Sequence, residues 1–195
     1  MYYDTLYLMD SLSGYASPKM KLTSLVKSGE YTRIRRGLYI KGDDYNLKTL
    51  ANVIYGPSYI SFEYALSYYG MIPERVETVT SAVYNKNKDK VFDTPAGRFT
   101  YRYINARLYF YGIDRQEENG EPYLIASKEK ALCDVLYKIK NTGDKINIER
   151  LLFEDLRIDE GEFLRLCITD LKFIVPLYGR ILHDKMLEYL KTRRK

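Results

Sequence analysis

The sequence predicts an α+β fold with two domains, residues 1–44 and 45–195. Helix and strand patterns occur together in both parts of the chain. The polar stretch KGDDYN at 41–46 has the composition of a short linker, and the basic charge is concentrated before it. With 195 residues, 46% of them hydrophobic, the chain has enough apolar side chains to build a core.

The N-terminal part is strongly basic, although the whole chain has a net charge of only +5. Between residues 17 and 41 there are seven basic residues and one acidic residue, and seven minus one gives +6. They are Lys19, Lys21, Lys27, Arg33, Arg35, Arg36 and Lys41, against Glu30. Because the rest of the chain sums to about zero, the sequence predicts a local basic surface, and its natural partner is a polyanion.

One short helix is predicted within the segment SPKMKLTSLVKSG. Ser17 can cap its start, Pro18 fits its first position, and Gly29 can end it in the left-handed conformation. The expected buried stripe is Leu22, Leu25 and Val26. The opposite face is Met20, Thr23, Ser24 and Lys27, with Lys19 and Lys21 on the flanks. Small hydroxyls and an ammonium group on one helix face suit the major groove of DNA, while the flanking lysines can reach phosphates.

A basic hairpin is expected after this helix. Strand-forming residues at 31–34 and 38–40 flank Arg35, Arg36 and Gly37, and the glycine can adopt the positive φ of a tight turn. A further helix pattern at 4–12 gives the order helix, turn, helix, basic hairpin, which is typical of a winged helix-turn-helix. The arginines would then lie on the wing, with Arg33 directed along the strand and paired with Glu30. The alternative is a solvated hairpin whose arginines only pair with nearby carboxylates.

The larger domain is predicted to hold a small, mainly antiparallel sheet and a helical C-terminus. Strands are expected in VETVTSAVY, FDTPAGRFTYRYI and RLYFYG. Helices are expected at 47–55, 62–70, 128–140, 148–156, 160–168 and about 176–194. Both cysteines, Cys133 and Cys167, fall in apolar helical patterns, so we expect buried thiols and neither a disulfide nor a zinc site.

A membrane or secreted location is not expected. No apolar run approaches the roughly 20 residues that cross a bilayer, and the stretch MYYDTLYLMD has aspartates where a secretory leader carries basic residues. These features favour a cytoplasmic protein.

Four segments, taken in order, resemble the AbiEi family of antitoxin transcriptional regulators. They are SLVKSGEYTRIRRGLYI, YISFEYALSYYGMIPE, TPAGRFTYRYI and IASKEKALCDVLY, spread over the first two thirds of the chain. The resemblance implies a type IV abortive-infection antitoxin: an N-terminal winged helix-turn-helix represses its own promoter at inverted repeats in double-stranded DNA. The C-terminal domain counters a co-encoded nucleotidyltransferase toxin without needing a stable complex with it.

The resemblance places DNA contacts on the basic helix and the wing, and two copies of the chain can meet on the DNA. These positions are Lys19, Lys21, Thr23, Ser24, Lys27, Arg33, Arg35 and Arg36. One feature departs from the family pattern, because only one clear helix precedes the basic helix where such domains usually have two. The segments SFEYALSYYG and SKEKALCDVLY are expected to be packing signatures. Exposed residues for antitoxicity are sought among Glu74, Arg75, Arg98, Arg102, Lys128 and Lys130.

An enzyme is not expected, and neither is a metal or another cofactor. His183 is the only histidine, and the sequence has neither a phosphate-binding loop nor a dinucleotide glycine motif. Asp170 and Lys172 are the nearest approach to a metal-dependent nuclease, but the additional upstream acid of a two-carboxylate site is missing. The remaining alternative is a protein-interaction module whose degenerate winged helix does not bind DNA.

Overall fold

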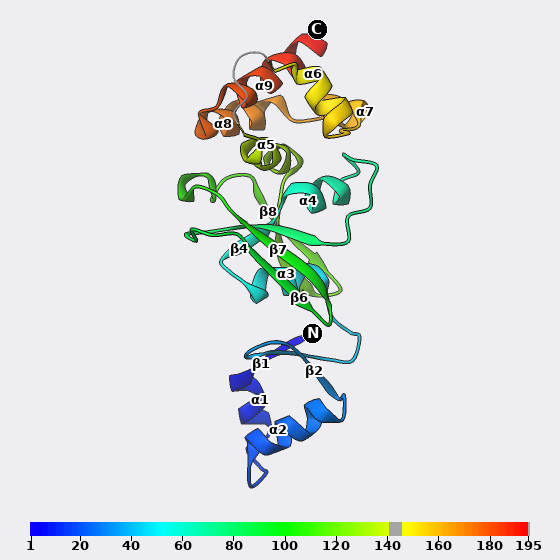
Figure 1. Ribbon diagram of the computed structural model, residues 1–195, viewed down its shortest axis with the longest axis vertical. Helices are drawn as coiled ribbons and strands as arrows, with labels where there is room; N and C mark the ends of the chain where they lie inside the picture. The colour runs from blue at the N-terminus through cyan, green and yellow to red at the C-terminus, as the bar shows by residue number, and fades with distance from the viewer. Residues whose placement is uncertain (141–145, 195) are drawn as a thin grey trace.

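The computed structural model describes residues 1–140 and 146–194, and it has an α+β architecture. The N-terminal unit lies at one end of the molecule, the larger sheet lies in the middle, and the C-terminal helices lie at the other end (Figure 1). Helix α5, Lys128–Lys138, lies between the larger sheet and the C-terminal helices. The basic segment and the C-terminal helices are therefore at opposite ends of the protein.

The N-terminal unit contains three strands and two helices. They are β1 (Tyr2–Asp4), α1 (Thr5–Ser11), α2 (Pro18–Lys27), β2 (Tyr31–Arg35) and β3 (Leu38–Lys41). The strands form an antiparallel sheet in the order β1-β3-β2. Both expected helices and the hairpin are confirmed, whereas strand β1 was not predicted because three residues are too few to give a pattern.

Local signals explain where these elements begin and end. The Asp4 carboxylate accepts a hydrogen bond from the Tyr7 backbone N–H at 2.8 Å and so caps α1. Pro18 occupies the start of α2, and Gly29 follows this helix with φ +79°. At the hairpin turn Gly37 has φ +86°, and its carbonyl accepts a hydrogen bond from the Thr5 N–H at 3.1 Å. The turn is thereby held against the start of α1.

The larger body contains a six-stranded sheet in the order β6-β7-β5-β4-β9-β8, within the described residues. Its strands are β4 (Ser58–Ile60), β5 (Val79–Val83), β6 (Lys90–Thr94), β7 (Gly97–Tyr103), β8 (Ile113–Glu118) and β9 (Glu121–Ala126). The pairs β4–β5, β6–β7 and β8–β9 are antiparallel, and the pairs β4–β9 and β5–β7 are parallel. The sheet is therefore mixed, and it is larger than the sequence indicated.

In the described part of the chain, two α-helices of the larger body lie before or between its strands, and the others come after the last strand. The first ones are α3 (Leu47–Ile54) and α4 (Phe62–Tyr68), both as expected. After α5 come α6 (Ile148–Arg150), a π-helical turn η2 (Leu151–Asp155), α7 (Glu160–Leu164), α8 (Ile168–Tyr178) and α9 (Ile181–Arg193). The expected end of α5 at 140 is close to the observed end at Lys138.

Three expectations for this body were wrong. RLYFYG does not form a strand, because residues Ala106–Leu108 form a 3-10 turn, η1, and the rest is a loop. The helix expected at about 176–194 is divided by Gly179, which has φ +57°, and Pro176 lies inside the preceding helix α8. Cys167 is exposed at the start of α8, although Cys133 is buried as expected.

The hydrophobic core crosses the expected domain boundary. A small cluster of Leu8, Leu12 and Leu22 lies within the N-terminal unit. Ile34, Leu38 and Ile40, on the strands of the same unit, belong instead to the large core that includes Leu50 and Ile54 of α3. The helices of the N-terminal unit therefore pack on one face of the small sheet, and the larger body packs on its other face.

Candidate nucleic-acid interface

Helix α2 presents a polar face at the end of the molecule far from the C-terminal helices (Figure 1). Lys19, Met20, Thr23, Ser24 and Lys27 are exposed on it and line a shallow depression of about 390 Å³. The apolar stripe on the other side of the helix is turned inward, with Leu22 buried and Leu25 and Val26 half-buried. The periodicity of the sequence thus gives the observed orientation of the helix.

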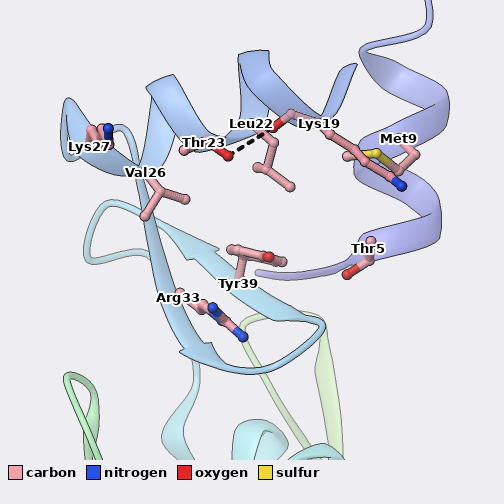
Figure 2. Close-up of a pocket in the computed structure, with 9 residues that line it drawn as sticks. All are labelled: Thr5, Met9, Lys19, Leu22, Thr23, Val26, Lys27, Arg33 and Tyr39. Carbon is pink, nitrogen blue, oxygen red and sulfur yellow. Dashed lines mark hydrogen bonds between the residues drawn. The ribbon is translucent and has the colours of Figure 1, made fainter. Parts of the chain in front are cut away.

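A groove of about 510 Å³ lies between α1, α2 and the three-stranded sheet (Figure 2). Its apolar surface comes from Met9, Leu22, Val26 and Tyr39, with Thr5 at the start of α1. Its cationic groups are Lys19 and Lys27 from α2 and Arg33 from β2. Since no carboxylate is among the residues that line it, these three cations together create a positive potential along one side of α2.

Arg33 reaches this groove because of the strand register. It lies opposite Tyr39 in the β2–β3 pair, and both residues line the groove. The Arg33 Nε–H donates a long hydrogen bond of 3.4 Å to the carbonyl of Arg35. The expected pairing of Arg33 with Glu30 was wrong, because Glu30 instead forms an ion pair with Lys41 at 3.1 Å, which raises the pKa of that lysine.

The other two arginines of the hairpin differ from Arg33 in position. The strand register shifts between Arg33 and Arg35, so Arg35 lies opposite Leu38, on the sheet face that packs against the larger body. Its guanidinium donates a hydrogen bond to the carbonyl of Ile54. Arg36 is exposed at the turn. Within residues 1–140 and 146–194, none of the three hairpin arginines forms an ion pair with a carboxylate. The structure therefore brings Arg33, but not Arg35, together with α2.

Two further residues of the predicted interface have specific contacts. Lys21 is half-buried, and its Nζ lies 4.8 Å from the centroid of the Tyr15 ring, in a cation–π contact on the flank of α2. The Thr23 hydroxyl donates a hydrogen bond of 2.9 Å to the carbonyl of Lys19. Sequence reasoning missed Met9, and it assigned Tyr39 to the wing without placing it in a groove beside α2. The alternation of strand 38–40 could have indicated that Tyr39 faces away from Leu38 and Ile40.

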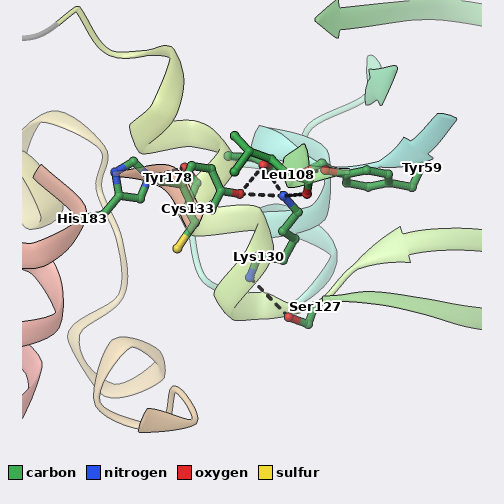
Figure 3. Close-up of polar contacts among 9 residues, drawn as sticks. Tyr59, Leu108, Ser127, Lys130, Cys133, Tyr178 and His183 are labelled. Carbon is green, nitrogen blue, oxygen red and sulfur yellow. Dashed lines mark hydrogen bonds and ion pairs between the residues drawn. The ribbon is translucent and has the colours of Figure 1, made fainter. Parts of the chain in front are cut away.

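A group of hydrogen-bonded polar side chains is buried between the sheet and the C-terminal helices (Figure 3). Lys130 Nζ donates to the Leu108 carbonyl at 2.8 Å, to Asp134 Oδ1 at 2.9 Å and to the Tyr178 hydroxyl at 2.6 Å. The hydroxyls of Ser61 and Tyr59 donate to Asp134 Oδ2 at 2.7 and 2.9 Å. Burial, together with the Asp134 charge, raises the pKa of both Tyr59 and Tyr178 well above the usual value, so both phenols stay protonated donors.

This buried cluster is a structural feature of the core. Lys130 is 1% exposed and Asp134 is fully buried, so the expectation that Lys130 is an exposed antitoxic residue was wrong. Ser61 comes from one segment of the family resemblance, and Lys130 and Asp134 come from another. Phe62, Ala65, Leu66, Ala131 and Leu132 of the same segments are also buried. The expectation that these segments are packing signatures is confirmed.

Several other candidates are on the surface of the larger body. Asp170 and Lys172 are exposed on α8, and no group of three or more histidine, cysteine, aspartate or glutamate side chains in the described residues could hold a metal ion. Ion pairs connect Glu74 with Arg157, Arg98 with Asp93, Arg102 with Glu63 and Lys128 with Glu162. Arg75 is exposed. None of the described helices is both long enough and apolar enough to cross a lipid bilayer.

Comparison of the chain with protein-family models and with curated proteins gives no match.

Proposed function

We propose that this protein is a cytoplasmic, sequence-specific repressor that binds double-stranded DNA through helix α2 and the adjacent groove. One observation carries the proposal: the exposed polar face of α2 continues into a groove with three cations and no carboxylate. Phosphate contacts from lysine and arginine position a protein on DNA, and base contacts from a helix in the major groove give specificity. The five elements of the N-terminal unit support a winged helix-turn-helix with a short wing.

The same reasoning supports a dimeric mode of binding. One winged domain reads only one segment of the major groove, so an inverted repeat in the chain's own promoter would be bound by two copies. The N-terminal unit, which carries the proposed DNA-binding helix α2, is far from the C-terminal helices (Figure 1). The larger body therefore stays accessible while the chain is bound to DNA.

We propose antitoxicity for the larger body, directed against a co-encoded nucleotidyltransferase toxin without a requirement for a stable complex. This part rests on the resemblance to the AbiEi family. Two of the segments that carry the resemblance pack into the core, which leaves antitoxicity to exposed residues such as Arg75. We propose a binding protein rather than an enzyme.

A protein-interaction module is the second candidate function, and the apolar surface of the groove favours it. Met9, Leu22, Val26 and Tyr39 together could accept an apolar side chain from a protein partner. The two functions differ in salt dependence, because phosphate contacts release counterions and apolar contacts do not.

A salt titration of three variants tests the DNA-binding proposal. We expect Arg33→Ala and Lys27→Ala each to weaken binding of a promoter duplex that contains the inverted repeat, and to lower the slope of log affinity against log salt by about 1 for each lost phosphate contact. Arg35→Ala is the matched control, since its guanidinium is bound to the Ile54 carbonyl, and it should keep the slope. Fluorescence anisotropy with promoter and scrambled duplexes measures both quantities. An unchanged slope for both Arg33→Ala and Lys27→Ala would reject the groove as the DNA site.

A further inference from the structure

The outward face of α2 carries an apolar contact surface as well as its polar groups. Met20 is 75% exposed on this helix. Thr23 follows three positions later, so the two side chains lie on the same side of the helix. Both line the shallow depression on the outward face, together with Lys19, Ser24 and Lys27.

The hydrogen bond of Thr23 determines which part of this side chain can meet a ligand. Its hydroxyl donates to the Lys19 carbonyl at 2.9 Å, as Figure 2 shows, so the hydroxyl proton is already committed. The methyl group occupies another position on the same Cβ, and the residue as a whole is exposed. Ser24, by contrast, uses its hydroxyl in no hydrogen bond within the described part of the chain.

Met20 and Thr23 therefore offer a thioether chain and a methyl group, with cations on either side. In the major groove, thymine is the only base that presents a methyl group, and apolar side chains contact it directly. Lys19 and Lys27 can bind phosphates on the two sides of such a contact, since both are exposed on α2.

We propose that Met20 and Thr23 are specificity-determining residues that recognise the C5-methyl groups of thymines in the operator half-site. This inference rests on the proposed DNA-binding function and adds the chemistry of the bases that α2 recognises. It assigns a role to Met20, which the charge pattern alone does not single out.

The test replaces thymine by uracil, which removes only the methyl group. Duplexes are first enriched from a random pool with the full-length chain, and each thymine of the enriched half-site is then changed to uracil. At one or two positions we expect affinity to fall about fourfold, the loss that corresponds to one buried methyl group. Met20→Ala and Thr23→Ser should each abolish the uracil effect at one of these positions. Thr23→Ser is a matched change, because it keeps the hydroxyl and removes only the methyl.

Leu6→Ala is the control for a general loss of apolar surface. Leu6 is 82% exposed on the neighbouring helix α1, and its replacement should leave the uracil effect unchanged. Circular dichroism verifies that each variant is folded. Equal affinity for every uracil duplex, or an undiminished uracil effect in both Met20→Ala and Thr23→Ser, would overturn the thymine assignment while DNA binding stands. If no duplex is enriched from the pool, the proposed function itself is rejected and this inference with it.

Discussion

Lys27 and Lys130 are the same residue type in opposite environments. Lys130 is buried and donates to three hydrogen-bond acceptors, one of which is the Asp134 carboxylate, its counter-ion. Lys27 is exposed on α2, and its neighbours in the groove are cations and apolar groups. A buried ammonium needs all its partners and cannot serve a ligand, whereas an exposed ammonium without a fixed carboxylate is available to phosphate.

Removal of the buried ammonium should destabilise the protein strongly. In Lys130→Met the Asp134 carboxylate keeps hydroxyl donors but loses its counter-charge, and we expect a loss of about 3–5 kcal/mol in the free energy of unfolding. The double variant Lys130→Met, Asp134→Leu removes both charges and should recover part of this loss. Urea denaturation of the two variants measures the difference. A single variant as stable as the wild type would show that the pair is not coupled.

We expect His183 to make the stability of the folded protein sensitive to acid. Burial lowers the pKa of this imidazole to about 4, from an ordinary value of 6.5, while its Nε2 is hydrogen-bonded to the Cys133 carbonyl at 2.9 Å. Between these two pKa values the unfolded chain binds more protons than the folded chain, so stability falls as the pH falls from 6.5 towards 4. We expect this residue alone to cost about 2 kcal/mol at about pH 5 relative to neutral pH.

The comparison of wild type with His183→Gln isolates that contribution, because the chain has no other histidine. Carboxylates titrate in both proteins and cancel in the difference. The variant should lose less stability between neutral pH and about pH 5, as measured by urea unfolding at both pH values. Parallel pH profiles for the two proteins would mean that the imidazole is accessible to protons in the folded state.

At the scale of elements, the loop after η1 is fixed by a close approach to α5 and α8. Gly112 has φ +67°, and a Cβ at this position would lie 2.9 Å from Lys130 Cβ and 3.0 Å from Ile174 Cδ1. Gly120, in the β8–β9 turn, has a similar φ of +76° but open space around it. The two glycines therefore share the conformational requirement and differ only in packing.

This pair of glycines allows a controlled prediction. Gly120→Ala should cost about 1 kcal/mol, the penalty for a left-handed residue with a Cβ. Gly112→Ala should cost about 1–3 kcal/mol more, since the added methyl must displace the lysine stem and the isoleucine. Denaturant midpoints of the two variants measure the difference. Equal costs would show that the loop moves freely away from α5.

The sequence predicted elements well where local signals were complete. Helix α2 has a proline at its start, a glycine after its end and an apolar stripe, and its observed bounds agree with the expectation. The β8–β9 hairpin was missed although Asn119 and Gly120 both have positive φ in its turn, a pair typical of two-residue hairpins. The division of the C-terminal helix at Gly179 was missed as well, because Pro176 was taken for a helix start and not for an interior residue.

The sequence predicted which residues supply the charge of the candidate site, but it did not predict how those residues are arranged in space. The sequence gives the cations of α2 and the hairpin, but which hairpin arginine joins α2 depends on strand register and on the body that covers the other face of the sheet. A one-residue change in register exchanges the two faces, and no local pattern specifies the covering body. For this reason we expect Arg33, and not Arg35, to be the hairpin arginine that contributes most to DNA binding.

At the scale of the whole molecule, the N-terminal unit is joined to the larger body by buried contacts. Ile34, Leu38 and Ile40 are part of the large core, and the Arg35 guanidinium is bound to the carbonyl of Ile54. Deletion of residues 1–44 would therefore expose apolar side chains of the remaining body. Substitutions on the exposed face of α2 leave the buried contacts between the N-terminal unit and the larger body intact. They therefore separate DNA binding from antitoxicity better than a truncation does.

A surface variant should lose repression and keep antitoxicity. We expect Lys19→Glu, Lys27→Glu in the full-length chain to abolish promoter repression, because the added carboxylates repel DNA phosphates on the face that carries both lysines. The larger body lies away from these residues, so cells that express the cognate toxin should still be rescued (Figure 1). Promoter-reporter activity and growth with induced toxin measure the two functions, and urea denaturation verifies that stability is unchanged. Loss of rescue in a variant that is stably folded would mean that antitoxicity also depends on the exposed face of α2. The assignment of DNA binding to the N-terminal unit and of antitoxicity to the larger body would then be wrong.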